Sequence, residues 1–205
     1  MDVWDGRAGN PGLYAVLSNR WSEDECAVVD SAQKSLIERL VQDLDGRRVV
    51  DLGCGVGRLT SWVSRRAGLT VGIDRSAGMV DRAQQAVAGR PAVALRASTA
   101  QLPLPSGAFD LVLAVFTLQH VVDEEEFRAS VREMGRVAAR PGGELLIVDG
   151  HNPTSAAQDV SSRTTTTVVR PLDAYGDLTR YADRVAVEEQ EYVGDRYLAQ
   201  VWRTR

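Results

Sequence analysis

The chain has 205 residues, of which 44% are hydrophobic and 25% are charged, and its formal net charge is −4. This length suits one domain with a full hydrophobic core, and the composition is that of an ordinary globular protein. The negative charge argues against a nucleic-acid surface, and no apolar stretch approaches the roughly 20 residues that a membrane span needs. The 2 Cys and 2 His form no cluster with metal-ligand spacing, so we expect neither a disulfide framework nor a metal site.

The first 45 residues combine an irregular segment with one predicted helix. Residues 1–21 contain Gly, Trp and acidic residues but no apolar run. They do not form a signal peptide, so we expect a cytoplasmic protein. From Ser22 onward apolar residues recur at three- and four-residue steps, which predicts an amphipathic helix. Ser22 and Glu25 fit a capping box at its start, and Gly46 marks its predicted end.

From Arg48 onward short apolar runs alternate with helical patterns. The apolar runs predict strands at residues 48–53, 69–74, 92–98, 109–116 and 144–150, and the helical patterns lie at residues 58–68, 76–89 and 123–143. Strands that alternate with helices indicate a parallel sheet covered on both faces. Residues 184–205 are different, because two alternating segments flank the turn pair Gly194-Asp195 and predict a hairpin. We therefore predict an α/β fold with a doubly wound, mostly parallel Rossmann-like sheet and a C-terminal antiparallel hairpin.

The stretch VVDLGCGVGRLT places Gly53, Gly55 and Gly57 at the exit of the first predicted strand. Glycines weaken an element unless the backbone must turn tightly or approach a ligand, and ligands of open α/β sheets bind beyond the carboxyl ends of the strands. A dinucleotide fingerprint would have its third glycine at position 58, which is Arg58. This departure argues against a nicotinamide-dependent oxidoreductase, as does the absence of a Tyr-x-x-x-Lys pair, since Lys34 is the only lysine.

The GxGxG pattern headed by an acidic residue resembles motif I of the class I S-adenosylmethionine (SAM)-dependent methyltransferases. VGIDRSAGMVDRA resembles the second family motif, and ASTAQLPLPSGAFDLVLAVFTLQHV resembles the third and fourth, in the style of the ubiquinone/menaquinone-type small-molecule methyltransferases. The resemblance covers about residues 45–150. It implies a single domain over residues 1–205 with a seven-stranded sheet, in which 1–45 form an N-terminal helical lid, 46–150 the SAM-binding core and 151–205 a substrate-side segment with the hairpin.

The resemblance also implies which residues hold the cofactor. The glycine loop would let the backbone approach the methionyl part of SAM, Asp51 would hold the loop or accept from the ammonium group, and Asp74 would accept from both ribose hydroxyls. Met79 would pack near the adenine. The family often has an acidic residue where this chain has Ser98, so we expect a weaker contact with the adenine amino group. The expected cofactor-contacting residues are Asp51, Gly53, Cys54, Gly55, Gly57, Asp74, Arg75, Met79, Ser98, Thr99, Ala100 and Val115.

The two histidines follow the fourth and fifth predicted strands. By resemblance, His120 faces the methyl acceptor, and Tyr14 and His151 are further candidates to complete that pocket. An imidazole with its ordinary pKa near ~6.5 could take a proton from the acceptor, or it could only orient the acceptor. Trp4, Tyr14 and Trp21 lie in the segment that resembles a lid over cofactor and substrate.

These residues lead us to expect an enzyme that transfers the methyl group of SAM to an oxygen or nitrogen atom of a small molecule, with S-adenosylhomocysteine as product. A secondary metabolite is one candidate acceptor. The alternatives are a methyltransferase for RNA or protein, a NAD-dependent Rossmann oxidoreductase and a non-catalytic protein with this fold. No Asn/Asp-Pro-Pro-aromatic motif follows the fourth strand, which disfavours methylation of a nucleic-acid base. The sequence determines neither the acceptor nor the oligomeric state.

Overall fold

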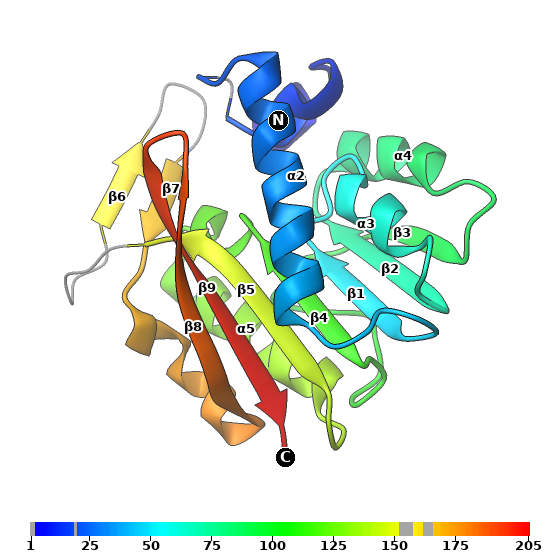
Figure 1. The fold of residues 1–205 in the computed structure, drawn as a ribbon, viewed down its shortest axis with the longest axis vertical. Coiled ribbons are helices and arrows are strands. Elements are labelled where there is room, and N and C mark those ends of the chain that lie inside the picture. Colours follow the sequence, from blue (N-terminus) through cyan, green and yellow to red (C-terminus); the bar gives the residue numbers. More distant parts are fainter. Residues whose placement is uncertain (1–2, 19, 152–157, 162–165) are drawn as a thin grey trace.

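A seven-stranded sheet forms the centre of the computed structural model, which describes residues 3–18, 20–151, 158–161 and 166–205. Its strand order is β3-β2-β1-β4-β5-β9-β8 (Figure 1). The strands are β1 (Arg48–Leu52), β2 (Leu69–Asp74), β3 (Ala92–Arg96), β4 (Leu111–Val115), β5 (Glu144–Gly150), β8 (Ala182–Tyr192) and β9 (Asp195–Thr204). Strands β1 to β5 pair in parallel, and β9 is antiparallel to both β5 and β8. The predicted parallel sheet with a C-terminal antiparallel hairpin is confirmed.

Helices cover both faces of this sheet, which is why its central strands read as continuous apolar runs. The helices are α1 (Val3–Arg7), α2 (Glu23–Leu40), α3 (Arg58–Val63), α4 (Ala77–Ala86) and α5 (Glu124–Ala138), with 3-10 turns η1 (Gly12–Ala15), η2 (Leu118–His120) and η3 (Leu172–Arg180). Alternate residues of one strand enter different cores. Leu111 and Leu113 of β4 pack in the cluster that contains residues of α2 and α3, whereas Val112 packs in the cluster with α5.

Helix α2 begins where the sequence predicts and ends six residues before the predicted stop at Gly46. The capping box is present, because the Ser22 hydroxyl accepts the Glu25 N–H at 3.2 Å and the Glu25 carboxylate accepts the Ser22 N–H at 2.7 Å. The helix stops at Leu40 because Val41 and Leu44 leave it to pack in the core, where they are 8% and 2% exposed. Gly46 instead forms the turn into β1, with φ of 71°.

The hairpin turn lies one residue earlier than the predicted Gly194-Asp195 pair. Val193 and Gly194 have φ of 51° and 80°, the left-handed conformation that a two-residue hairpin turn of type I′ requires. Asp195 is already the first residue of β9 and pairs with Tyr192.

The N-terminal segment, expected to be irregular, contains α1 and η1 and is anchored on α4. The Ser76 hydroxyl donates to Asp5 at 2.6 Å, and one nitrogen of the Arg82 guanidinium donates to the carbonyls of Ala8 and Asn10, each at 2.7 Å. The Arg7 guanidinium is nearly buried and donates to the Tyr14 carbonyl at 3.0 Å. Residues 3–17 are thus held in place by side-chain hydrogen bonds.

The connection from β5 to β8 contains secondary structure of its own. It carries a separate two-stranded sheet, β6 (Gln158–Ser161) paired with β7 (Thr166–Val169), followed by η3. Arg170, just after β7, is 4% exposed and donates to the Val121 carbonyl at 2.8 Å, which ties this connection to the loop after β4. None of the helices within the described ranges has the length and apolar character required to cross a membrane.

Candidate active site

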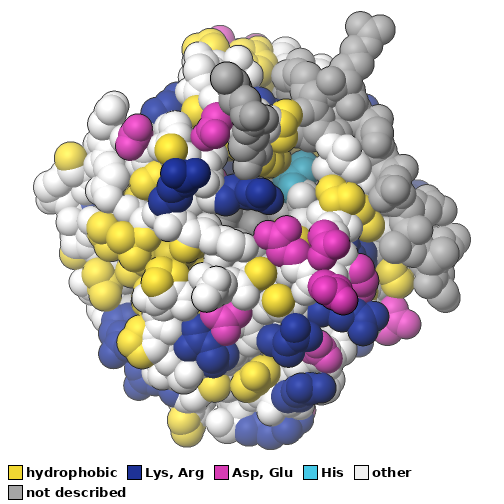
Figure 2. Space-filling view, turned by 180° about the vertical axis from the view of Figure 1, so that it is seen from behind, with side chains coloured by type: hydrophobic (Ala, Val, Ile, Leu, Met, Phe, Trp, Pro, Cys, Tyr) yellow, Lys and Arg dark blue, Asp and Glu magenta, His cyan; other side chains and the backbone are white. Residues whose placement is uncertain are grey.

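A cavity opens beyond the carboxyl ends of β1, β2 and β4, with an empty volume of ≈ 890 Å³ that includes its open mouth. Figure 2 shows a hollow on the face opposite that of Figure 1, with basic side chains and a histidine at its edge and acidic side chains clustered beside it. A cavity at this edge of an α/β sheet suits a small-molecule ligand. The predicted site residues that line it are Asp51, Gly53, Cys54, Gly55, Asp74, Arg75, Ser98, Thr99, Val115 and His120.

Five predicted site residues are not in the cavity lining: Gly57, Met79, Ala100, Tyr14 and His151. Gly57 precedes α3 with φ of 81°, and a Cβ there would lie 3.0 Å from the Ala83 Cα atom, so this glycine lets α3 approach α4. Met79 is fully buried within α4. Tyr14 packs against the core cluster that contains α2, and the closest acidic oxygen to His151 Nε2 is that of Glu189 at 3.9 Å.

The glycine loop leaves no room for side chains at two positions. Gly53 and Gly55 have φ of 65° and 53°, a conformation that costs a residue with a Cβ about 1–2 kcal/mol. A Cβ on Gly53 would lie 2.4 Å from Thr117 Cγ2, and one on Gly55 would lie 2.3 Å from Val16 Cγ1. The bare backbone at these positions therefore forms part of the cavity wall between β1, the loop after β4 and the N-terminal segment.

Two aspartates anchor this loop and face the cavity. Asp74 accepts the Gly55 N–H with one carboxylate oxygen and the Ser76 N–H with the other, both at 2.9 Å. Asp51 is 2% exposed and accepts the Thr60 hydroxyl at 2.6 Å. Burial raises the pKa of Asp51 to about 6, partly offset by this hydrogen bond and by the Arg58 charge. At neutral pH Asp51 remains mostly ionised, so both carboxylates are hydrogen-bond acceptors.

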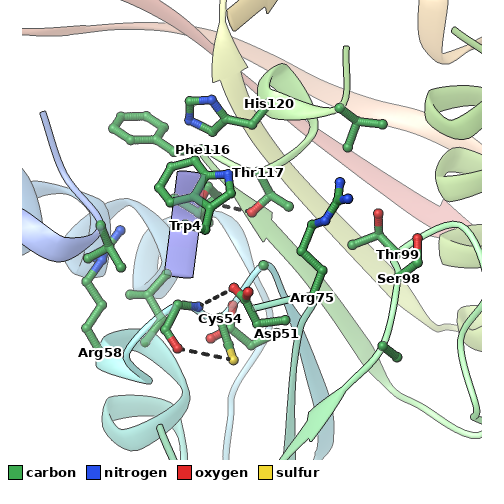
Figure 3. A pocket seen from close by; sticks show the side chains of 18 of the residues that line it. Trp4, Asp51, Cys54, Arg58, Arg75, Ser98, Thr99, Phe116, Thr117 and His120 are labelled. Atoms are coloured by element: carbon green, nitrogen blue, oxygen red, sulfur yellow. Dashed lines mark hydrogen bonds between the residues drawn. The ribbon is translucent and has the colours of Figure 1, made fainter. Parts of the chain in front are cut away.

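Arg58 lies in the cavity wall on the side opposite Ser98 and Thr99 (Figure 3). Its guanidinium pairs with Asp30 at 2.8 Å and also donates to Gln33, both of α2. The sequence marked Arg58 only as a departure from the dinucleotide pattern, and the structure places this residue in the lining of the cavity.

Cys54 and Val115 are packed lining residues with no reactive chemistry. Cys54 is 4% exposed, and burial raises the pKa of its thiol well above the ordinary range, so the nucleophilic thiolate does not form at neutral pH. This agrees with its interpretation as a packed residue of the loop.

The rim opposite the glycine loop is aromatic. The Trp4 and His120 rings meet edge to face with centroids 4.9 Å apart, and Phe116 lies beside them (Figure 3). Phe116 has φ of 58°, an uncommon conformation for a bulky residue, and its ring stacks on Tyr197 at 4.4 Å. Sequence reasoning did not select Phe116, Thr117 or Val16 for the site, because nothing in their local patterns distinguishes them from core residues.

The hydrogen bonds around His120 define its tautomer. Gln119 accepts the Gly150 N–H through its carbonyl oxygen at 2.6 Å, so its amide nitrogen faces His120 Nε2 at 3.4 Å. On the other side, Nδ1 lies 3.4 Å from the Thr166 carbonyl, which can only accept. We therefore assign the proton to Nδ1, and Nε2 is the acceptor.

The expectation that His120 has an ordinary pKa is wrong. Burial lowers its pKa to about 4, in spite of the opposing effect of the Thr166 carbonyl. Removing the imidazole from water disfavours its charged form. His120 is therefore neutral throughout the physiological pH range.

Comparison with known proteins identifies the class. Residues 50–147 match the family model described as a methyltransferase domain. Together with the strand order and the glycine loop, this match supports a class I SAM-dependent methyltransferase. SAM is the cofactor of this class.

Individual relatives agree with this class. The chain is similar to a ubiquinone biosynthesis O-methyltransferase of Rhodopseudomonas palustris, with 34% identity over 150 residues that cover 70% of this chain and 55% of the relative. The chain spans about half the length of the curated relatives it matches. The magnesium protoporphyrin IX methyltransferase of Synechocystis with bound S-adenosylhomocysteine has the same fold, with 19% identity, a TM-score of 0.72 and coverage of 100% of this chain and 94% of that one. So has the [4+2]-cyclase SpnF, with 20% identity, a TM-score of 0.71 and coverage of 98% and 92%.

Proposed function

We propose that this chain transfers the methyl group of SAM to an oxygen or nitrogen atom of a small molecule and releases S-adenosylhomocysteine. The observation that carries the proposal is the set of charges around the glycine loop. Arg58, Asp51 and Asp74 all face one cavity whose floor is backbone without side chains. A secondary metabolite is one class of acceptor compatible with this proposal.

The residues present fit the cofactor. Its carboxylate suits Arg58, its ammonium group suits the adjacent Asp51, and its ribose hydroxyls suit Asp74 at the end of β2. The left-handed glycines let the loop pack against Thr117 and Val16, where a Cβ would overlap either side chain, and they leave bare backbone in the cavity lining. Bound SAM supplies a methyl group activated by a sulfonium sulfur.

The contribution of the protein to transfer is alignment of the acceptor with that methyl group. Holding two reactants in line can contribute roughly 7–11 kcal/mol of barrier reduction. His120 Nε2 can accept a hydrogen bond from an acceptor O–H or N–H in place of its long contact with Gln119. Because its pKa of about 4 makes the imidazole a weak base, we assign His120 an orienting role. Trp4 and Phe116 would exclude water around the acceptor.

A small-molecule acceptor is favoured over RNA or protein by how the cavity is covered. Trp4 and Val16 of the N-terminal segment line it together with the β4 loop, so a macromolecule would have to displace that segment. The acidic residues 123–126 at the start of α5 would repel a phosphate backbone. Methylation of RNA or protein remains the alternative that the acceptor assay below distinguishes.

Calorimetry tests cofactor binding directly. We expect S-adenosylhomocysteine to bind at micromolar concentration, and we expect no detectable binding of NAD. Asp74→Asn keeps the shape of the side chain and removes its charge, and it should weaken binding by about 1.5–3 kcal/mol, the range for a hydrogen bond to a charged group. Asp81→Asn, on the exposed side of α4, is the matched control and should leave the affinity unchanged. Tight binding of NAD would refute the proposal.

The acceptor class is tested with SAM that carries a labelled methyl group. The label should enter the small-molecule fraction of a cell extract and not its RNA or protein fraction. Transfer to a macromolecule alone would replace the proposed acceptor class with the alternative.

A further inference from the structure

The acidic run at the start of α5 does not behave as one solvated group. Asp123 accepts the Glu126 N–H at 2.8 Å as the helix cap, Glu124 pairs with Arg128 at 3.0 Å, and Glu125 is exposed. Glu126 is half-buried and is the member of this run that lines the cavity. Glu126 therefore differs from the other acidic residues of this run in its position at the cavity.

Ser98 holds the Glu126 carboxylate in place. Its hydroxyl oxygen accepts the Ala100 N–H at 3.1 Å, and its proton is donated to Glu126 Oε1, also at 3.1 Å. A serine has a single hydroxyl proton, so this bond commits it to the carboxylate. Ser98 and Glu126, 28 residues apart in sequence, together present a negative acceptor at the cavity edge beyond β3.

The number of carboxylates in the cavity lining equals the number of hydrogen-bond donor groups on the cofactor. Among the described residues, the carboxylates of the lining are those of Asp51, Asp74 and Glu126. The donors of S-adenosylhomocysteine are the ammonium group, the ribose hydroxyls and the adenine amino group. The lining contains two arginines, of which Arg75 lies on the side of Ser98 and Arg58 lies across the cavity (Figure 3). We take Arg58 to bind the ligand's own carboxylate, which sets the direction of the ligand. With the amino-acid end at Arg58 and Asp51 and the ribose at Asp74, the base falls next to Ser98 and Glu126.

We propose that Glu126 accepts a hydrogen bond from the exocyclic amino group of the adenine and thereby selects adenine over a 6-oxo purine. This inference rests on the proposed function, because it takes the ligand to be SAM or its product. A carboxylate of α5 thus binds the adenine amino group, because Ser98, which follows β3, has no carboxylate to do so. Ser98 becomes a positioning residue that acts through Glu126.

The test compares S-adenosylhomocysteine with S-inosylhomocysteine, in which a carbonyl oxygen replaces the amino group. The wild-type protein should prefer the adenosyl compound, because a carboxylate repels the 6-oxo group. Glu126→Gln should bind S-adenosylhomocysteine about 10- to 100-fold more weakly, the equivalent of losing a charged hydrogen bond. It should bind the inosyl compound as well as or better than the wild type does, because an amide can donate to the carbonyl. The readout is the ratio of the two dissociation constants measured by calorimetry.

Two further variants separate recognition from stability. Glu125→Gln removes the same charge from the neighbouring exposed position of the same helix turn, and the ratio should not change. Ser98→Ala should shift the ratio in the same direction as Glu126→Gln but less, and it tests the proposal even if Glu126→Gln does not fold. If the wild type binds S-adenosylhomocysteine but shows no preference, or if Glu126→Gln keeps the wild-type ratio, the role of Glu126 is refuted while the proposed function stands. If the wild type binds neither compound, the proposed function itself fails.

Discussion

Replacing Gly55 by alanine should lower the free energy of unfolding, and the size of the effect should depend on the overlap of the new Cβ with Val16. Gly55 has φ of 53°, and a Cβ there would lie 2.3 Å from Val16 Cγ1. Ordinary contact between carbon atoms is about 3.5–4.0 Å, so Val16 would have to move by more than about an ångström. Val16 belongs to the N-terminal segment and Gly55 to the loop after β1, so the substitution probes the contact between them.

The expected magnitude has two parts. The left-handed backbone costs a residue with a Cβ about 1–2 kcal/mol, and steric overlap in a packed site costs about 1–3 kcal/mol more. Gly89 separates the two parts, because its φ is 73° and a Cβ there would meet no atom within 4 Å. We expect Gly89→Ala to lower the free energy of unfolding by about 1–2 kcal/mol and Gly55→Ala to lower it by about 2–5 kcal/mol.

The assay is urea unfolding followed by tryptophan fluorescence and circular dichroism. The decisive measurement is a double-mutant cycle of Gly55→Ala with Val16→Ala, which removes the clashing methyl group. The double variant should be more stable than the sum of the single effects by about 1–3 kcal/mol. Additivity within about 0.5 kcal/mol would show that Val16 does not press on the glycine loop, and it would refute the arrangement of the N-terminal segment over the cavity.

Three further predictions concern the acceptor side and the N-terminal segment that covers it. His120→Ala should leave the affinity for S-adenosylhomocysteine within about twofold and lower turnover by about tenfold at every pH from 6 to 9, because the pKa of His120 is about 4 and the imidazole stays neutral there; a loss of about 10²–10⁴ would instead indicate a general base. In the unfolded state His120 has an ordinary pKa near ~6.5, so as the pH falls it binds a proton before the folded state does. The contribution of neutral His120 to the free energy of unfolding should therefore be complete above that pH and be lost as the pH falls towards 4. A His120→Asn variant should lack this pH dependence in urea unfolding. Deleting residues 1–11 should abolish turnover without unfolding the chain, because it removes Trp4 but keeps the buried Ala15 and Leu17; a truncated protein with full activity would contradict the lid.

Much of the candidate site could be predicted from local sequence because it lies at the carboxyl ends of strands. Asp51 is the penultimate residue of β1, Asp74 is the last residue of β2, and the glycine loop starts directly after β1 at Gly53. Recognising the strands was therefore enough to place these residues at one edge. Met79, in contrast, does not line the cavity. Its position after β2 is correct, but the direction of a side chain in α4 depends on which face packs against the sheet, and that face buries Met79.

The sequence by itself determined the order of the elements, the parallel sheet and the position of the glycine loop, because strand and helix periodicity and backbone freedom are local properties of the chain. The tertiary structure alone decided which side chains meet and what their charges are. His120 is neutral because burial removes it from water, and one ring that packs on it is that of Trp4, far away in sequence. Glu126 faces the cavity because Ser98 binds its carboxylate, and α2 ends early because Val41 and Leu44 gain more from the core than from another helical turn. Desolvation and packing depend on groups far apart in sequence, and no local pattern encodes them.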